Sequence, residues 1–181
     1  MMDWLPWAPL AAASCHIFEE FVWPGGFPDW YRKYLPRETR ITTRMLTIVN
    51  GVLLACCLNY ALMADTKLGA AALLGLSALL CSNGIWHAWA SVRTHSVSPG
   101  VVTGMLLYVP LMIVEFEVFL RSGRVSLWIA VLVALLGGSY HFWSALYHRG
   151  GGAKRVGVPR TSDEPRAEEL GEQRVSGAPR Q

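Results

Sequence analysis

Three ionisable side chains, His16, Glu19 and Glu20, interrupt the first apolar stretch of the chain, which covers residues 5–22. On a helix, positions three and four apart share a face, so both carboxylates would flank the imidazole. Ionisable groups are costly inside a membrane, and a cluster of them there is a functional-site hypothesis by default. Small residues that let a second helix approach closely lie on the same face: Pro9, Ala12 and Ala13. The cluster is therefore expected to point into protein and not into lipid.

Two further histidines in apolar stretches, His87 and His141, would complete a nitrogen and oxygen ligand set that suits zinc first and non-haem iron second. The spacing from His16 to Glu20 is similar to the H-x-x-E-H pattern of inverted zincins, in which the outer residues bind metal and the inner glutamate is the base. By this analogy we predict His16, Glu20, His87 and His141 as metal ligands and Glu19 as the catalytic base. An exchange of roles between the two glutamates, and a site with two metal ions, are the alternatives.

Two asparagines are predicted to support this set. Asn83 precedes His87 by one helical turn, where it would orient the ring, bridge two helices or touch substrate. Asn50 lies in the second apolar stretch, at a depth in the membrane similar to that expected for the three histidines. The competing interpretation of the whole cluster is a buried hydrogen-bond network that ties helices together. Glu115 shares a helix face with Tyr108, and the sequence assigns it no role.

The composition is that of an integral membrane protein. The chain has 181 residues, of which 52% are hydrophobic and only 16% charged. This is too apolar for a soluble domain with a charged shell. The net charge of +3 arises from basic residues between and after the apolar stretches, with no aromatic-interleaved patch, so nucleic acid is excluded as a partner. The four cysteines lie in apolar stretches without metal or redox spacing.

The apolar stretches predict an all-α bundle of five transmembrane helices, since about 20 residues are needed for each crossing. Residues 23–31 are interpreted as a break with interfacial aromatic residues, and Pro99 is placed in the first turn of the fourth helix. Residues 151–181, rich in Gly, Pro, Arg and Glu, are predicted to be a disordered tail that follows the membrane domain of residues 1–150. The predicted spans are 5–22, 41–64, 68–92, 99–120 and 125–148.

Lysines and arginines decide the expected orientation. Thirteen of the 16 lie on the side of the loop after the first span, and three lie on the opposite side. The positive-inside rule then places the N-terminus outside and the C-terminus in the cytoplasm, in a multi-pass protein of the plasma membrane. In this orientation His16, His87 and His141 all lie about 8 to 10 Å from the inner ends of their helices, at 1.5 Å rise per residue.

A family resemblance adds to this interpretation. Over residues 10–148 the chain resembles the HXXEE family of small integral membrane proteins. The resemblance implies the site, with a histidine from the last span, and implies no substrate. It is carried by four motifs: His16-x-x-Glu19-Glu20, Trp23-Pro24-Gly25-Gly26, Asn83-x-x-x-His87 and Ser98-Pro99-Gly100-x-x-Thr103.

The function expected from these features is a metal-dependent intramembrane enzyme, most simply a hydrolase. The metal would lower the pKa of a bound water and Glu19 would take its proton. A substrate that reaches this layer of the bilayer would be lipid-like or amphipathic. One alternative is a di-iron oxidoreductase, and another is a transporter or proton pathway that uses the Glu/His cluster. A bis-histidine haem protein is a weaker alternative, because two carboxylates lie in the same layer.

Overall fold

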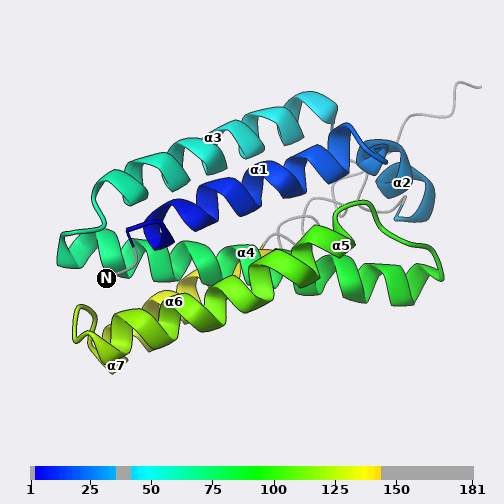
Figure 1. Cartoon of the computed structure of the whole chain (residues 1–181). Helices are drawn as coiled ribbons and strands as arrows, with labels where there is room; N and C mark the ends of the chain where they lie inside the picture. Colours follow the sequence, from blue (N-terminus) through cyan, green and yellow to red (C-terminus); the bar gives the residue numbers. More distant parts are fainter. Residues whose placement is uncertain (1–2, 36–41, 144–181) are drawn as a thin grey trace, which may run out of the picture. The chain divides into compact units, whose positions relative to one another are not determined.

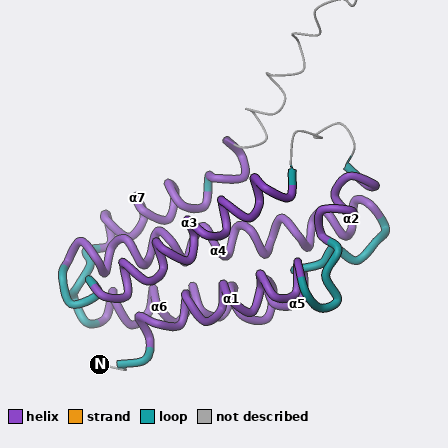
Figure 2. Tube along the Cα trace, turned by 90° about the horizontal axis from the view of Figure 1, so that it is seen from above, coloured by secondary structure: helices purple, strands orange, loops and turns teal. Residues whose placement is uncertain are grey.

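The computed structural model describes residues 3–35 and 42–143, and every regular element in these ranges is helical. The first part of the chain comprises a short helix η1 (Leu5–Trp7), α1 (Ala8–Phe21) and α2 (Phe27–Tyr34). Then follow α3 (Thr43–Leu62) and α4 (Lys67–Thr94). The last part comprises α5 (Val101–Thr103), a π-helical segment η3 (Gly104–Tyr108), α6 (Val109–Arg121) and α7 (Leu127–Gly138). The long helices lie alongside one another (Figures 1 and 2).

Within residues 3–35 and 42–143, three helices are long and apolar enough to cross a membrane: α3, α4 and the continuous helix Val101–Arg121 that α5, η3 and α6 form together. These features indicate a membrane protein. The first and last predicted spans are shorter than expected. Helix α1 has 14 residues, and α7 has 12 before an interruption at Ser139, with helical residues resuming up to Trp143. Residues 144–148 of the last predicted span, and the predicted tail, lie outside the described residues.

Helix α4 is the centre of the bundle, and α1, α3, α6, η3 and α7 all pack on it. Glycines on both sides of these contacts permit the close packing. A side chain at Gly84 of α4 would meet the backbone of Gly104 in η3, and one at Gly137 of α7 would meet the backbone of Gly75 in α4. The N-terminus of α4 is fixed by Thr66, whose hydroxyl accepts a hydrogen bond from the Gly69 N–H at 2.9 Å.

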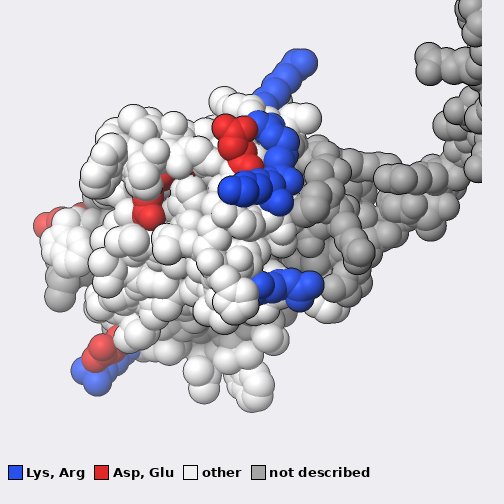
Figure 3. Space-filling model, turned by 90° about the vertical axis from the view of Figure 1, so that its right-hand side faces the viewer, with Lys and Arg blue, Asp and Glu red and all other residues white. Residues whose placement is uncertain are grey.

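Charged side chains lie at the ends of the long helices. Figure 3 views the end where α2 lies and α4 finishes, and most of the surface there is uncharged apart from a few basic and acidic side chains. The exposed basic residues of this end include Arg32, Lys33, Arg44 and Arg93. Those of the opposite end include Lys67 and Arg121. An apolar band between two charged ends is the pattern of a bilayer-embedded bundle.

Two predictions about connecting segments are wrong. Residues 27–34 form helix α2, so the predicted break is limited to residues 23–26. The aromatic residues Phe27, Trp30 and Tyr31 of this helix are buried against Ala90. The signals for this helix are present in the sequence as Pro28 and Asp29 in its first turn and two basic residues in its last. Pro99 is not in the first turn of the fourth span either, because that helix begins at Val101, after Gly100 in a left-handed conformation.

Candidate metal centre

The predicted face of α1 is buried in protein, as its sequence pattern indicates. His16, Glu19 and Glu20 are all buried, and so are the small residues one and two turns earlier. Alanines at these positions bring α1 close to its neighbours, so that the two carboxylates and the imidazole are enclosed by helices instead of lipid.

Three of the four predicted ligands come together. The side chains of His16, Glu20 and His87 offer ligand atoms that all lie within 4.8 Å of one another, and each of the three is buried. Glu20 Oε1 lies 3.1 Å from His87 Nε2 and 3.5 Å from His16 Nε2. The two imidazole rings meet edge to face, with centroids 5.0 Å apart. Helices α1 and α4 thus present two nitrogen atoms and a carboxylate oxygen to one point.

The other ring nitrogen of His16 is held by a hydroxyl group. Nδ1 lies 3.0 Å from Thr103 Oγ1, and that hydroxyl donates its proton to Glu19 Oε2 at 2.5 Å. Because a hydroxyl has a single proton, Thr103 must accept a hydrogen bond from His16 Nδ1–H. The lone pair of the neutral ring is then on Nε2, which lies 2.9 Å from Asn83 Nδ2 and 3.5 Å from Glu20 Oε1. This is the tautomer that a metal-binding histidine requires, fixed through its second nitrogen.

His87 is oriented in the same manner. Its Nδ1 lies 2.9 Å from Ser98 Oγ, which donates to the backbone oxygen of Pro99 at 3.4 Å. The hydroxyl can therefore accept from His87 Nδ1–H and leave the lone pair of Nε2 directed at Glu20. Asn83 Nδ2 lies 2.9 Å from His16 Nε2 and can donate to its lone pair, whereas the lone pair of His87 Nε2 faces Glu20 Oε1 at 3.1 Å. Two acceptors that face each other in a buried site repel unless a cation or a shared proton lies between them. The arrangement is chemically suited to hold a divalent ion.

Glu19 lies beside this group and is not part of it. Its Oε2 accepts from Thr103 N at 2.7 Å as well as from the Thr103 hydroxyl, and its Oε1 accepts from Val102 N at 3.2 Å. These N–H groups belong to the first turn of the helix Val101–Arg121, whose first N–H groups lack partners within the helix. A carboxylate at a helix N-terminus also interacts favourably with the helix dipole. Glu19 therefore fixes this helix to α1 and, through Thr103, fixes the His16 ring.

Gly100 covers the ligand group with backbone alone. A Cβ atom at this position would lie 2.8 Å from His16 Cε1, 3.0 Å from His87 Cε1 and 3.1 Å from Glu20 Cγ. Its φ angle of +98° also favours glycine. The turn from Ser98 to Gly100 therefore both orients one ligand and closes the site. These residues belong to one of the motifs that carry the family resemblance, but the motif alone did not indicate what they contact.

Helix α2 closes another side of the site. The ring of Phe27 lies 5.1 Å from that of His87, between centroids, and Trp30 Nε1 donates to Ser96 Oγ at 3.1 Å. Since α2 was not predicted, the sequence analysis did not identify Phe27 as a neighbour of the site.

The remaining predicted residues line a cleft next to the ligand group. Asn83 Nδ2 lies 2.9 Å from His16 Nε2, so Asn83 contacts a predicted ligand directly. His141 is not within the group of converging ligand atoms. Its ring stacks on Trp86 with centroids 5.9 Å apart, and its buried Nε2 has no hydrogen-bond partner among the described residues. Asn50, Asn83 and His141 all line a cleft of about 480 Å³ between α3, α4 and α7.

Fold and site together define a class: a helical membrane protein in which two imidazoles and a carboxylate converge at the buried junction of two helices. The chain belongs to the HXXEE family, because the family model described as a protein of unknown function with HXXEE motif matches residues 7–115. The matched segment contains His16, Glu20 and His87 and ends before His141. Comparisons with curated proteins and with solved structures gave no match.

Proposed function

We propose that the bundle crosses the plasma membrane five times, with the N-terminus outside and the C-terminus in the cytoplasm. The three long apolar helices support this topology, as does the excess of lysine and arginine on the predicted inner side of the sequence. The shorter helices α1 and α7 would cross where the bundle thins the bilayer locally. Reporters fused after Arg149 and before Asp3 test the proposal. We expect them on opposite sides, and finding both on one side would contradict the five-span topology.

The proposed biochemical function is that of a metal-dependent hydrolase whose metal is held by His16, Glu20 and His87. The observation that carries this proposal is the convergence of His16 Nε2, His87 Nε2 and Glu20 Oε1 within a buried group. Two histidines and one glutamate, with a fourth position free, are the ligand set of catalytic zinc sites. Structural zinc sites fill all four positions with protein side chains, and the convergent group offers three.

The proposed reaction is the hydrolysis of an ester or amide. A zinc ion in such a site supplies a coordinated water of lowered pKa and polarises a carbonyl group. The oxygen of water joins the acyl carbon, the bond from that carbon to the leaving oxygen or nitrogen breaks, and the leaving group takes a proton. The residues of this chain would hold the ligands in a fixed tautomer and keep bulk water out, since Gly100 and Phe27 cover the site.

Glu19 is proposed as a positioning residue instead of the base predicted from sequence. Its oxygens already accept three hydrogen bonds, from Thr103 and Val102. It therefore acts on His16 through the Thr103 hydroxyl, which takes the place that a directly bonded carboxylate, carbonyl or water has beside many metal-binding histidines. The role of base then falls to a group other than Glu19.

A second candidate function is a mononuclear non-haem iron oxidoreductase, since the same two-histidine, one-carboxylate set binds iron in such enzymes. The di-iron alternative needs a second bridging carboxylate, and Glu19 is turned to Thr103. The proton-pathway alternative would use the same cluster without any metal. Metal identity separates these three candidates.

The hydrolase proposal is tested with the full-length protein purified in detergent. We would assay fluorogenic acyl esters and acyl amides before chelation, after chelation, and after zinc or ferrous iron is added back. Zinc-restored hydrolysis is expected. Restoration by iron alone, together with dioxygen consumption, would favour the oxidoreductase, and activity that survives complete chelation would overturn both metal-dependent proposals.

A further inference from the structure

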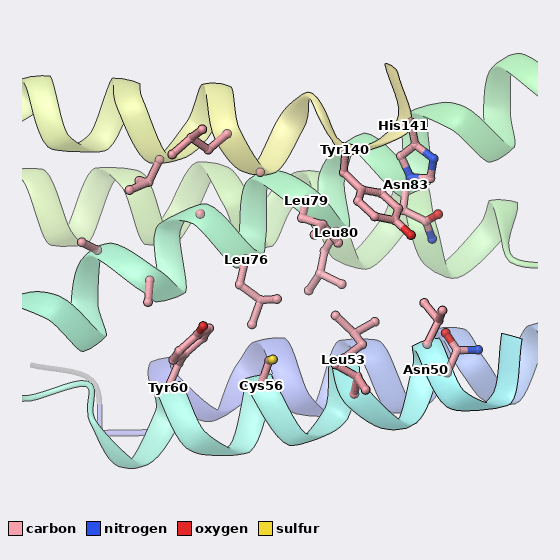
Figure 4. Close-up of a pocket in the computed structure, with 18 residues that line it drawn as sticks. Asn50, Leu53, Cys56, Tyr60, Leu76, Leu79, Leu80, Asn83, Tyr140 and His141 are labelled. Carbon is pink, nitrogen blue, oxygen red and sulfur yellow. The ribbon is translucent and has the colours of Figure 1, made fainter. Parts of the chain in front are cut away.

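The cleft between α3, α4 and α7 is elongated and polar at one end. Along α4 its lining extends from Ala71 to Asn83, which corresponds to about 18 Å at 1.5 Å per residue. Figure 4 shows Asn83, Tyr140 and His141 grouped near one end with Asn50 across from them, and Tyr60 near the other end. The middle of the cleft is lined by small and aliphatic side chains such as Leu53, Cys56, Gly75, Leu76 and Leu80.

None of the described residues that line the cleft carries a formal charge when His141 is neutral. A phosphate or ammonium headgroup would therefore find no counter-ion there, and desolvating it would be costly. A neutral amide, ester or hydroxyl group would instead meet the side chains of Asn50, Asn83 and His141 as hydrogen-bond partners. A neutral polar group with one hydrocarbon chain matches an elongated cleft whose amide and imidazole side chains gather at one end, with the Tyr60 hydroxyl near the other.

Two observations indicate that the polar end is arranged for a ligand. His141 Nε2 is buried without a hydrogen-bond partner among the described residues, although its ring is held in place by stacking on Trp86. A buried polar atom without a hydrogen bond costs free energy unless a ligand or a water molecule supplies the missing hydrogen bond. The other observation is Asn83, which lines the cleft and also contacts His16 Nε2 at 2.9 Å. The polar end of the cleft is thus separated from the ligand group by one side chain.

We infer that this cleft binds an uncharged single-chain lipid, a fatty acyl ester or amide, with its chain along α4 and its carbonyl group between Asn83 and His141. The inference rests on the proposed function for what happens to the carbonyl group afterwards. Binding itself depends on the cleft and not on the metal, so the two can fail separately. The hydrocarbon chain would lie on α4 between α3 and α7, where it would enter from the surrounding bilayer.

The experiment uses the full-length protein in nanodiscs and a palmitoyl amide that carries a photoreactive diazirine at the end of its chain. We expect crosslinks to the apolar part of the cleft, around Cys56 on α3 and Ala72 on α4. Unlabelled palmitamide and monopalmitoyl glycerol should compete, whereas lysophosphatidylcholine and the palmitate anion should compete at least about tenfold less well, because their charged groups have no partner in the cleft. Equal competition by the charged lipids would overturn the inference.

Matched variants place the site. Cys56→Trp fills the cleft from α3 and should lower crosslinking at least about tenfold. Leu58→Trp, two residues away on the same helix and exposed, should not. His141→Phe keeps the stack on Trp86 and removes both ring nitrogens, so affinity for the neutral amide should fall about 2- to 10-fold, the usual value of one hydrogen bond. Unchanged labelling in both Cys56→Trp and His141→Phe, with folded protein confirmed by gel filtration, would overturn the inference.

A repeat after chelation separates this inference from the proposed hydrolase. If the cleft is the lipid site, crosslinking persists without metal. Crosslinking that persists in a protein which binds no metal would overturn the hydrolase and leave the lipid site standing. A protein that binds metal but gives no competed crosslink in the cleft would overturn the lipid site and leave the metal centre standing.

Discussion

Two buried carboxyl groups pack against α4, and their surroundings differ. Glu20 faces two imidazoles, and the second nitrogen of each ring is held by a hydroxyl group. Glu115 on α6 is fully buried too, but among the described residues its hydrogen-bond partner is the Ser77 hydroxyl, and its Oε1 has none. Ser77 precedes His87 by ten residues, about 15 Å along α4.

This difference separates a ligand site from a helix contact. At Glu20, three potential ligand atoms converge and each ring is supported by further hydrogen bonds, which is the construction of metal centres. At Glu115, one hydroxyl and one carboxyl group join α4 to α6, which is a common means of association between membrane helices. Burial of a carboxyl group is therefore not enough to identify a site, and the number of convergent ligand atoms is the better criterion.

The largest effect is expected from the convergent ligands. His16→Ala, His87→Ala and Glu20→Gln should each reduce bound metal from about one ion per chain towards zero, because an incomplete ligand shell in a buried site has little water to replace the lost group. His141→Ala should retain the metal, since its ring is stacked on Trp86 outside the convergent group. Metal analysis of the purified variants measures this, and loss of metal in His141→Ala would return that residue to the ligand set.

Gly100→Ala should have the next largest effect, because the new Cβ would clash with the His16 ring and crowd His87 and Glu20, and the φ angle of +98° would strain the backbone by about 1–3 kcal/mol. Metal occupancy and thermal stability should both fall. Gly123→Ala is the matched control, since its φ of +68° is also positive while nothing lies within 4 Å of a Cβ there. If both variants lose equal stability and both keep metal, Gly100 is not a cover for the site.

The Glu19–Thr103 contact should have a smaller effect that distinguishes positioning from base catalysis. Glu19→Gln and Thr103→Val are expected to weaken metal affinity about 10- to 100-fold, as is usual when the partner of a metal-binding histidine is removed. Thr103→Ser keeps the hydroxyl and should restore the affinity. Titration of apoprotein with zinc measures this. Full metal affinity in Glu19→Gln, with turnover lowered about 100- to 10,000-fold, would instead support Glu19 as the base.

The smallest effect is expected at Glu115. Glu115→Gln keeps a group that can bond with Ser77, so metal content should be unchanged and stability should change by no more than about 1 kcal/mol. Thermal unfolding in detergent, followed together with metal content, checks this. If Glu115→Gln lost the metal, the two carboxyl groups would belong to one functional network and the contrast between them would be wrong.

The helices and the inward face of α1 could be predicted because apolar length and helical spacing are local properties of the sequence. The predicted boundaries of the three long spans lie within about two residues of α3, α4 and the helix Val101–Arg121. Helix α2 was missed because its short length and its aromatic residues were interpreted as an interface, although Pro28 and Asp29 are helix-start signals.

The contacts within the site could be predicted only in part. The similar depth of His16 and His87 along their helices correctly predicted that they lie close together, because residues at one level of a bundle can meet. Depth does not specify the direction around a helix, so it could not separate His87 from His141, which stacks on Trp86. The same limit applies to Glu19 and Glu20, which are adjacent in sequence yet have carboxyl groups that meet different partners.

The central claim is that His16, Glu20 and His87 hold one divalent ion, and the most direct test is the metal-to-protein ratio of the purified full-length protein, measured beside Glu20→Gln and Glu115→Gln. The account predicts about one ion per chain in the wild type and in Glu115→Gln, and almost none in Glu20→Gln. A wild type that neither retains metal nor takes up added zinc or iron, or a Glu20→Gln variant that holds as much metal as the wild type, would contradict it and leave a buried hydrogen-bond network.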